Sequence, residues 1–282
     1  MTTTHLCERV SVTLSVVSHG HGEQVLEMLQ SFIRSGLLQH WQVQVIVTLN
    51  IHEPSLHAAL QVLQWPFPLE VVENAEPKGF GANHNQASRR ALGDWFCVVN
   101  PDIQWCTAVA PHRASDRLQA ALALPAMANG KPVGLYCPEQ VTAEGIRQDY
   151  ARTLPTPWVL AARWAARQRN TGQLQGVAPG VGQAHWVNGA CLLVPLHTYL
   201  QLGGFDERYF MYCEDVDFCL RLQLQGYLLA AMPLAVVHAA QRNTRRQRQH
   251  LYWHLRSLLR LWCSPTFWRY WYDMGRNPSR QN

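Results

Sequence analysis

Three short segments of this 282-residue chain combine residue types that could do chemistry. The first is Asn100-Pro101-Asp102, which follows the apolar run Trp95–Asn100. A strand that ends in aspartate places one carboxylate at the edge of a sheet. A Mg²⁺ or Mn²⁺ ion that bridges two phosphates needs only one or two such protein ligands. The pattern therefore suggests Asp102 as a metal ligand, although Asn-Pro-Asp is also a common turn and that alternative stays open.

The second segment is Glu214-Asp215-Val216-Asp217, which holds three carboxylates in four residues. Acidic residues stabilise the positive end of a helix, so a helix that begins at Glu214 explains part of this cluster. Crowded carboxylates also raise one another's pKa, which favours a group that accepts a proton at neutral pH. The pattern thus predicts a general base among these carboxylates.

The third segment, AAMPLAVVH, is an apolar run that ends at His238, a possible neutral imidazole ligand, although a lone histidine there is usually structural. A glycine-rich turn, Lys78–Asn85, could bring backbone close to a ligand and present helix N–H groups to an anion. It is neither a Walker loop nor a dinucleotide fingerprint, because the spacing of both is absent. His19 and His21 could bind metal, but histidines in a turn more often face solvent.

The elements that must position these residues alternate between strand and helix through the first half of the chain. We expect strands at Val10–Ser18, Val43–Asn50, Leu69–Asn74 and Trp95–Asn100, with helices near Glu23–Ser35, Pro54–Gln64 and Gly81–Leu92. This order predicts an α/β fold of the Rossmann-like type, a mostly parallel sheet with helices on both faces. Such sheets bind ligands beyond the carboxyl ends of their strands, which directs attention to Ser18, Asn50, Asn74 and Asn100.

The second half is less regular. Residues 139–184 are rich in Pro, Gly, Gln and Arg, with one helical stretch at Trp158–Arg169, and read as an excursion that recognises substrate. A strand is expected at Trp186–Pro195 and a helix from Glu214. We expect one domain over residues 1–240 and a basic, aromatic helical segment over residues 241–282.

Composition, at 48% hydrophobic and 15% charged residues, is that of ordinary globular protein. The first residues lack a basic and then apolar signal peptide, and no apolar run reaches the ~18 residues of a membrane span. The eight cysteines are scattered without a CxxC pair, so zinc is disfavoured and reduced thiols of a cytoplasmic protein are expected.

The net charge of +5 is concentrated near the end of the chain, where arginines alternate with aromatic residues. The residues are Arg242, Arg245, Arg246, Arg248, Arg256 and Arg260, with Trp253, Trp262, Trp268, Trp271 and Tyr272. Two interpretations stay open: an amphipathic helix packed on its own domain, and a surface for an anionic membrane such as the inner membrane. Nucleic acid is the least favoured partner.

Taken together, these segments resemble the family 2 glycosyltransferases with the GT-A fold, and specifically their rhamnosyltransferase-like branch. The resemblance runs from about Val10 to about Leu261. Its most specific stretches are PKGFGANHNQA (Pro77–Ala87), FCVVNPDI (Phe96–Ile103) and the run Val187–Tyr227. HLRSLLR (His254–Arg260) is also similar to the closing helix of that branch.

The resemblance implies roles for individual residues. Asp102 would help to hold the metal, Mn²⁺ or Mg²⁺, with Asn100 beside it and His238 completing the site. Asp215 would be the catalytic base, with Glu214 as neighbour and second candidate. The remaining donor-binding candidates are Ser18, His19, Asn50, Gly79, Gly81 and Asn85. The implied reaction is a single in-line displacement that inverts the anomeric carbon.

The implied donor is a nucleotide-diphosphate sugar, with dTDP-L-rhamnose favoured, and the acceptor a lipid-linked or lipopolysaccharide-type saccharide of a bacterial surface glycan. Two departures fall in the nucleotide half. Leu49 stands where relatives carry an acid, and His19 where Tyr or Asn is common. A nucleotidyltransferase, or a nucleotide-sugar-binding module without catalysis, is the alternative.

Overall fold

The computed structural model describes residues 9–106, 124, 126–128, 130–168, 183–239 and 247–276. Cys7, Arg242, Arg245, Arg246, the side chain of Arg248 and residues 169–182 of the expected excursion lie outside the described residues. No helix in the described ranges is both long and apolar enough to cross a bilayer.

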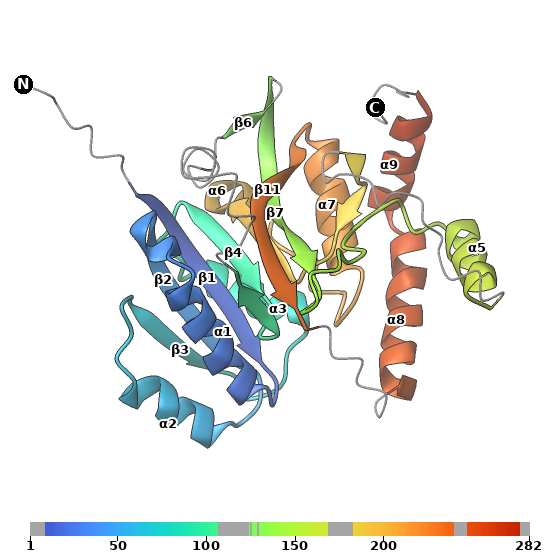
Figure 1. Ribbon diagram of the computed structural model, residues 1–282. Helices are drawn as coiled ribbons and strands as arrows, with labels where there is room; N and C mark the ends of the chain where they lie inside the picture. The colour runs from blue at the N-terminus through green and yellow to red at the C-terminus, as the bar shows by residue number, and fades with distance from the viewer. Residues whose placement is uncertain are drawn as a thin grey trace, which may run out of the picture.

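Four parallel strands form the first half of the main sheet, in the order β3-β2-β1-β4. The strands are β1 (Val10–Ser18), β2 (Trp41–Leu49), β3 (Leu69–Glu73) and β4 (Trp95–Val99), connected by α1 (Gly22–Arg34), the 3₁₀ turn Leu37–Gln39, α2 (Pro54–Val62) and α3 (Phe80–Ser88). All four strands end at the same edge, as the alternation of strand and helix predicts. Figure 1 shows this half in blue and cyan, with α1 lying across β1 and β2.

The second half extends the sheet past β4 with strands of mixed direction. These are β10 (Cys191–Pro195), β7 (Lys131–Val141), β11 (Leu228–His238) and β5 (Ile103–Trp105), with the short β6 (Met127–Ala128) against β7. β10 runs antiparallel to β4 and β7, whereas β7 and β11 are parallel. β5 pairs antiparallel with β11, with Ile103 opposite His238. This pairing brings the residues just before β5 to the end of β11.

Two hydrophobic cores lie on opposite faces of the sheet, which confirms the prediction of helices on both faces. One contains α1 side chains such as Phe32 with Val99 of β4, and the other contains the neighbouring Val98 with Phe218. Alternate residues of one strand therefore pack into different cores, as expected for a strand covered on both sides.

The strand expected over Trp186–Pro195 is divided. β9 (Trp186–Val187) pairs with β8 (Ala151–Arg152) in a separate two-stranded sheet, and β10 starts only at Cys191. The intervening Asn188-Gly189-Ala190 leaves the ladder and forms a turn. The residues of this range have high β-propensity throughout, so the sequence predicts one strand. It does not show that the two pieces pair with different strands.

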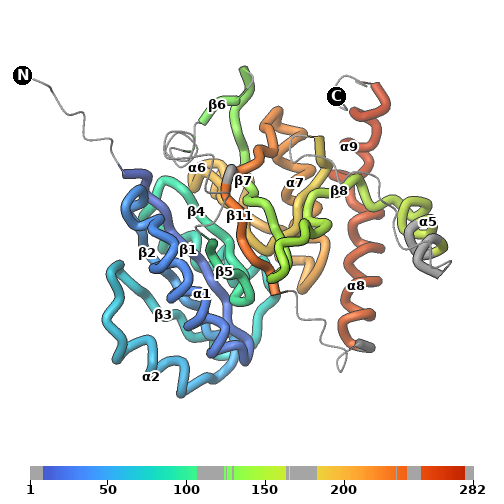
Figure 2. The backbone as a smooth tube through the Cα atoms, in the orientation of Figure 1, coloured from blue at the N-terminus to red at the C-terminus, as the bar shows by residue number. Residues whose placement is uncertain are grey.

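The remaining helices are α5 (Pro157–Gln168), α6 (Leu196–Gln201), α7 (Glu214–Leu224), α8 (Gln247–Trp262) and α9 (Pro265–Arg276). The basic, aromatic segment thus forms two helices, separated at Ser264 and Pro265 because proline favours a new helix start. Phe267 and Tyr270 of α9 are buried in the core that also contains Phe218 of α7. Figure 2 shows α8 and α9 at the side of the molecule opposite α1 and α2.

A buried histidine lies between α3 and β1. The His84 side chain is fully buried, its Nδ1 is 2.8 Å from the Ser15 hydroxyl, and the Phe80 ring packs on it at 4.5 Å between centroids. Burial lowers the pKa of His84 to about 3 from its ordinary value of 6.5. The folded protein therefore holds this imidazole neutral.

The stability of the protein should respond to pH through His84. Below pH 6.5 the imidazole binds a proton in the unfolded chain, whereas in the folded chain it stays neutral down to about pH 3. The free energy of unfolding therefore decreases as the pH is lowered from 6.5 to 3. At pH 5 the loss from this group is about 2 kcal/mol. The free energy of unfolding is measured in urea at pH 7 and at pH 5 for the unmodified protein and for His84→Asn. Between these two pH values His84→Asn should lose about 2 kcal/mol less stability than the unmodified protein. Equal losses in both proteins would contradict the assignment.

Candidate active site

The ends of β1 and β2 lie side by side and carry the first candidate donor-binding residues. The Ser18 hydroxyl donates to Glu53 Oε2 at 3.0 Å, and Gly20 N–H donates to Glu53 Oε1 at 3.0 Å. Glu53 thus supplies a carboxylate at this end of the sheet, where the resemblance expects an acid at position 49. Leu49 itself is 1% exposed, so it belongs to the core. No motif or spacing around Glu53 singled it out.

An asparagine network continues from β2 to the glycine-rich turn. Asn50 Nδ2 donates to the Lys78 carbonyl at 2.9 Å and lies 3.2 Å from Nδ1 of His19. Asn50 Oδ1 accepts from Lys78 N–H and from Asn74 Nδ2, which also donates to Asn83 Oδ1. The Oδ1 atom of Asn74 is buried without a partner among the described residues, so an acceptor is left at the strand ends.

The glycines of the turn face another part of the chain. A Cβ on Gly79 would lie 2.6 Å from the Phe210 carbonyl oxygen, and one on Gly81 would lie 2.6 Å from Cβ of Phe205. Both positions therefore require glycine for close packing on the segment 205–210. Contact of these glycines with a nucleotide or sugar stays a prediction.

Asn85 ties the same two parts together. Its Nδ2 donates to the Phe205 carbonyl and to Glu207 Oε1, and its Oδ1 accepts from Tyr199 Oη at 2.7 Å and Phe205 N–H at 2.9 Å. These bonds use both amide donors and both acceptor lone pairs of the side chain. The geometry thus gives Asn85 the task of positioning the segment that leads to α7, and its contact with donor stays a prediction.

Asp102 and His238 lie together at the junction of β5 and β11. Nε2 of His238 is 3.5 Å from Oδ2 of Asp102, and the side chains are 13% and 16% exposed. Asp102 Oδ1 and His238 Nδ1 are buried without a hydrogen-bond partner in the described part of the chain. The pairing of β5 with β11, together with the 3.1 Å bond from Ala239 N–H to the Asp102 carbonyl, brings the two residues into contact. Asn100 anchors the turn before them through its own N–H, which donates to the Ala190 carbonyl.

This pair fits a divalent cation. Burial of polar atoms without partners is costly, and a cation would satisfy the unpaired carboxylate oxygen. No cluster of three or more His, Cys, Asp or Glu that could hold a metal occurs within the described ranges. One carboxylate and one imidazole suffice for an ion that takes its remaining ligands from water and a diphosphate.

Glu214 and Asp215 begin α7 after an unusual backbone turn. Tyr212 and Cys213 both have positive φ, at 72° and 64°, a region that costs a residue other than glycine about 1–3 kcal/mol. Asp215 Oδ2 accepts from Gly189 N–H at 3.0 Å and Oδ1 accepts from Val216 N–H at 2.8 Å. The break between β9 and β10 supplies the Gly189 N–H, so the divided strand has a role in holding Asp215.

The two adjacent carboxyl groups differ in environment. Burial and the neighbouring Asp215 hold the pKa of Glu214 well above its usual range, and Glu214 Oε2 has no partner among the described residues. Burial also raises the pKa of Asp215, but the N–H groups of Val216 and Gly189 oppose that rise. We therefore place a shared proton on Glu214 and leave Asp215, which is half-buried, ionised. An ionised and accessible Asp215 can accept a proton.

Helix α8 supports this turn from outside. The Tyr212 hydroxyl is 2.8 Å from Nδ1 of His250, the Phe210 ring packs on Trp253 at 5.1 Å, and Ser257 donates to the Met211 carbonyl at 2.8 Å. The local sequence around Glu214 carries no signal for these contacts.

His21, the second histidine of the turn after β1, donates its backbone N–H to Ser18 Oγ.

Asp217 of the acidic cluster has a structural role. It is 3% exposed and accepts from Arg221 Nε at 2.7 Å, and Arg221 also donates to the carbonyls of Leu202 and Gly204. Gly204 has a positive φ of 68°, and a Cβ there would overlap Asn85 Oδ1. The acidic cluster therefore combines one ionised carboxylate, one protonated neighbour and one anchor for the segment 202–205.

Comparison with known proteins finds two rhamnosyltransferases that are similar in sequence to this chain. No protein-family model matches the chain. It is 35% identical over 175 residues to the N-acetylglucosaminyl-diphospho-decaprenol L-rhamnosyltransferase of Mycobacterium tuberculosis, a match of 59% of this chain and 54% of that enzyme. It is 40% identical over 77 residues, 27% of this chain and 29% of the other, to the rhamnosyltransferase WbbL of Escherichia coli. The chain therefore spans about half the length of the mycobacterial relative, and less of WbbL.

A solved structure shares the fold across almost the whole chain. The mannosyltransferase PcManGT from Pyrobaculum calidifontis, in complex with GDP-Man and Mn²⁺, covers 96% of this chain and 76% of its own, with a TM-score of 0.56 at 17% identity. The fold prediction is confirmed by this likeness, and the sequence relatives agree with the resemblance drawn from the motifs. This chain thus has the GT-A fold and is similar in sequence to rhamnosyltransferases.

Proposed function

We propose that this protein is an inverting glycosyltransferase that moves a sugar, L-rhamnose from dTDP-rhamnose, onto a saccharide acceptor of a bacterial surface glycan. The observation that carries the proposal is the pair of sites at one edge of the sheet. Asp102 and His238 present unsatisfied metal-ligand atoms, and Asp215 is held by two backbone N–H groups as an accessible base. The rhamnosyltransferase relatives support the choice of sugar.

The residues of the chain divide the work between donor and acceptor. Ser18, His19, Asn50 and Asn74 lie at the strand ends where a nucleotide binds in sheets of this type. Asp215 accepts the proton of the acceptor hydroxyl as that oxygen attacks the anomeric carbon and the bond to the diphosphate breaks. Such general-base help is typically worth ~10²–10⁴-fold. Glu214, protonated, leaves the negative charge on Asp215.

Asp102 and His238 would hold a Mn²⁺ or Mg²⁺ ion together with the donor diphosphate. When bound, the ion neutralises the negative charge that develops on the departing diphosphate. The Mn²⁺ in the mannosyltransferase of the same fold supports this part of the proposal. Asp102 contributes the hard oxygen ligand, and the pairing of β5 with β11 keeps His238 beside it.

The acceptor is proposed to be a lipid-linked saccharide at the cytoplasmic face of the inner membrane. The name of the mycobacterial relative describes such an acceptor, N-acetylglucosaminyl-diphospho-decaprenol. A protein that works on this substrate needs contact with a lipid surface, and the exposed aromatic and basic residues of α8 and α9 suit one.

One panel of nucleotide sugars tests the function. dTDP-rhamnose, UDP-sugars and GDP-sugars are each added with and without Mn²⁺, and both thermal stability and transfer of labelled sugar to N-acetylglucosaminyl-diphospho-polyprenol are measured. We expect one donor at 100 times its Kd to stabilise the fold by about 2.7 kcal/mol and to be transferred only with metal. Stabilisation without transfer would favour a binding module. Transfer of a nucleotidyl group instead of a sugar would favour a nucleotidyltransferase.

A further inference from the structure

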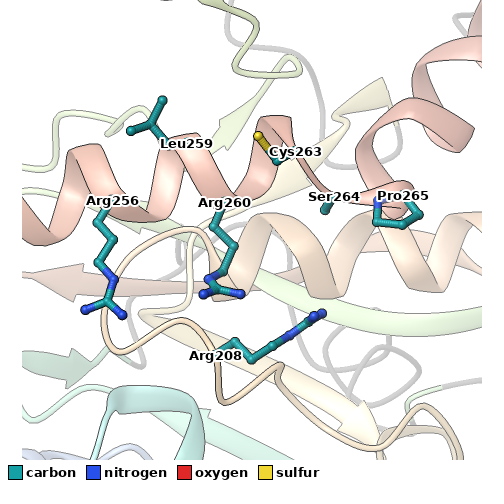
Figure 3. A pocket seen from close by; sticks show the side chains of 7 residues that line it. All are labelled: Arg208, Arg256, Leu259, Arg260, Cys263, Ser264 and Pro265. Atoms are coloured by element: carbon teal, nitrogen blue, oxygen red, sulfur yellow. The ribbon is translucent and has the colours of Figure 1, made fainter.

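Three arginines surround a cavity at the junction of α8 and α9. The cavity has a volume of about 380 Å³ and is lined by Arg256 and Arg260 of α8, by Arg208 from the segment 205–210, and by Ser264 and Pro265 at the start of α9. Figure 3 shows the side chains of Arg256 and Arg260 leaving α8 on the same side, toward the segment that carries Arg208. A volume in this range is typical of a site for a small ligand.

Two of the three arginines at this cavity have no ion-pair partner among the residues that the structure describes. Arg208 donates through Nε and Nη2 to Asp206, at 2.9 and 2.6 Å, so its charge is balanced. Arg256 and Arg260 form no ion pair with any residue in the described ranges. Two unpaired guanidinium groups one helical turn apart form a fork that suits a phosphate.

The exposed face of α8 carries a row of leucines next to the row that contains Arg256 and Arg260. Leu251, Leu255 and Leu259 recur every four residues and are 58%, 53% and 60% exposed. Arg256 and Arg260 form the adjacent row of the same helix, following the exposed Tyr252. The opposite face, with Ser257, Leu258 and Leu261, is buried against the protein. The exposed leucines are therefore not needed for packing within the described structure.

The next helix, α9, also exposes large aromatic side chains. Trp268, Trp271 and Tyr272 are 50%, 44% and 54% exposed, and the two tryptophan rings contact each other at 5.6 Å. Their spacing of three and four residues places them on one side of the helix. Exposed leucine and arginine on α8, together with exposed tryptophan on α9, match the composition of helices that lie in the headgroup zone of a membrane.

We infer that the cavity of Arg208, Arg256 and Arg260 binds the phosphate of an anionic lipid headgroup, with the hydrocarbon chain lying along the exposed leucines of α8. Charge complementarity selects the phosphate, and the adjacent apolar row selects a lipid over a free anion. This inference deepens the proposed function, since it says where a phosphorylated lipid meets the protein. Arg208 belongs to the segment that leads to Asp215, so the lipid would be held next to the support of the base.

Vesicle binding tests this inference. The full chain, without any sugar donor, is titrated with vesicles of phosphatidylcholine alone and of an equal mixture with phosphatidylglycerol, and bound protein is measured by flotation. We expect binding to the anionic vesicles only. Arg256→Gln/Arg260→Gln should weaken it roughly 30-fold, which is the general loss for two cations at an anionic surface. Arg256→Gln alone, at an exposed position, should weaken it roughly fivefold and guards against misfolding of the double variant.

The matched control is Arg34→Gln/Arg89→Gln, which removes the same charge from exposed positions at the ends of α1 and α3. Its binding should change less than about twofold, because screening limits the effect of distant charges. An equal loss in both double variants would overturn the site, since only net charge would matter. Thermal stabilisation by inorganic phosphate that requires Arg256 and Arg260, without vesicle binding, would overturn the lipid as the source. The assay needs no glycosyl transfer, so its failure leaves the proposed function standing.

Discussion

Replacement of Asp215 with asparagine is expected to lower kcat by about 10²–10⁴-fold, the usual value of general-base help. Asparagine has one side-chain carbonyl oxygen, so it can accept at most one of the two hydrogen bonds from Gly189 N–H and Val216 N–H. It cannot take the proton of the hydroxyl group on the sugar acceptor. KM for the donor should change little, because no hydrogen bond among the described residues connects the Asp215 side chain with the Asn50 network. Initial rates of sugar transfer, together with donor-induced thermal stabilisation, measure the two effects separately.

Glu214→Gln is the matched control for this result. Glutamine resembles the protonated glutamic acid that we place at position 214, so kcat should fall by less than about tenfold. If instead Glu214→Gln loses as much activity as Asp215→Asn, the base would be Glu214. The unfolding midpoint of each variant shows whether the fold is kept.

The pH dependence of kcat separates these roles further. Burial raises the pKa of Asp215 above its ordinary range, and the base must be ionised to act. The rate should therefore rise with pH through the raised pKa of the carboxyl pair and then level off. Glu214→Gln should leave the midpoint nearly unchanged, because the protonated Glu214 carries no charge that opposes ionisation of Asp215.

Replacement of Asp102 with asparagine is expected to weaken the binding of the metal that supports donor binding. The carboxylate is the hard ligand of the proposed site, and its loss should lower the transfer rate by roughly 10²–10³-fold, the equivalent of several kcal/mol of charge stabilisation. Titration of Mn²⁺ in the presence of donor, followed by thermal stability, should show a midpoint shifted to much higher concentration.

His238→Gln gives the comparison within the same site. A neutral amide can still ligate, so we expect a smaller shift in the Mn²⁺ midpoint, about tenfold. Removal of metal with EDTA should abolish transfer in the unmodified protein and restore it on addition of Mn²⁺. Full activity of Asp102→Asn at low metal concentration would show that the ion, if used, binds elsewhere.

The sequence predicted the parallel half of the fold well because its signals are local. Apolar strands end in polar residues at Ser18, Asn50 and Asn100, and the helices between them have ordinary turn residues. The expectation that Asp102 and His238 share one metal site rested on the resemblance to a family. No local pattern connects two residues that meet only because β5 and β11 are neighbours in the sheet.

Other features of the site depend on contacts between distant segments, which a single sequence does not reveal. Gly189 holds Asp215 only because the expected strand Trp186–Pro195 is divided. The positive φ of Tyr212 is unexpected for an aromatic residue, and contacts with α8 accompany it. Gly81 was singled out as a donor-binding residue, which stays a prediction, and the group that lies close to it within the protein is Phe205.

The four hydrogen bonds of Asn85 also bear on how the protein folds. They connect α3 to residues 114 to 122 positions later in the chain, and the segment they hold leads directly to Asp215. Contacts of such large sequence separation form late, because a long loop must close before these contacts add stability. The parallel strands β1 to β4 can assemble as soon as they are synthesised, whereas Asp215 acquires its position only when the second half of the chain is present. Refolding followed by a fluorescent donor should therefore lag behind the return of secondary structure.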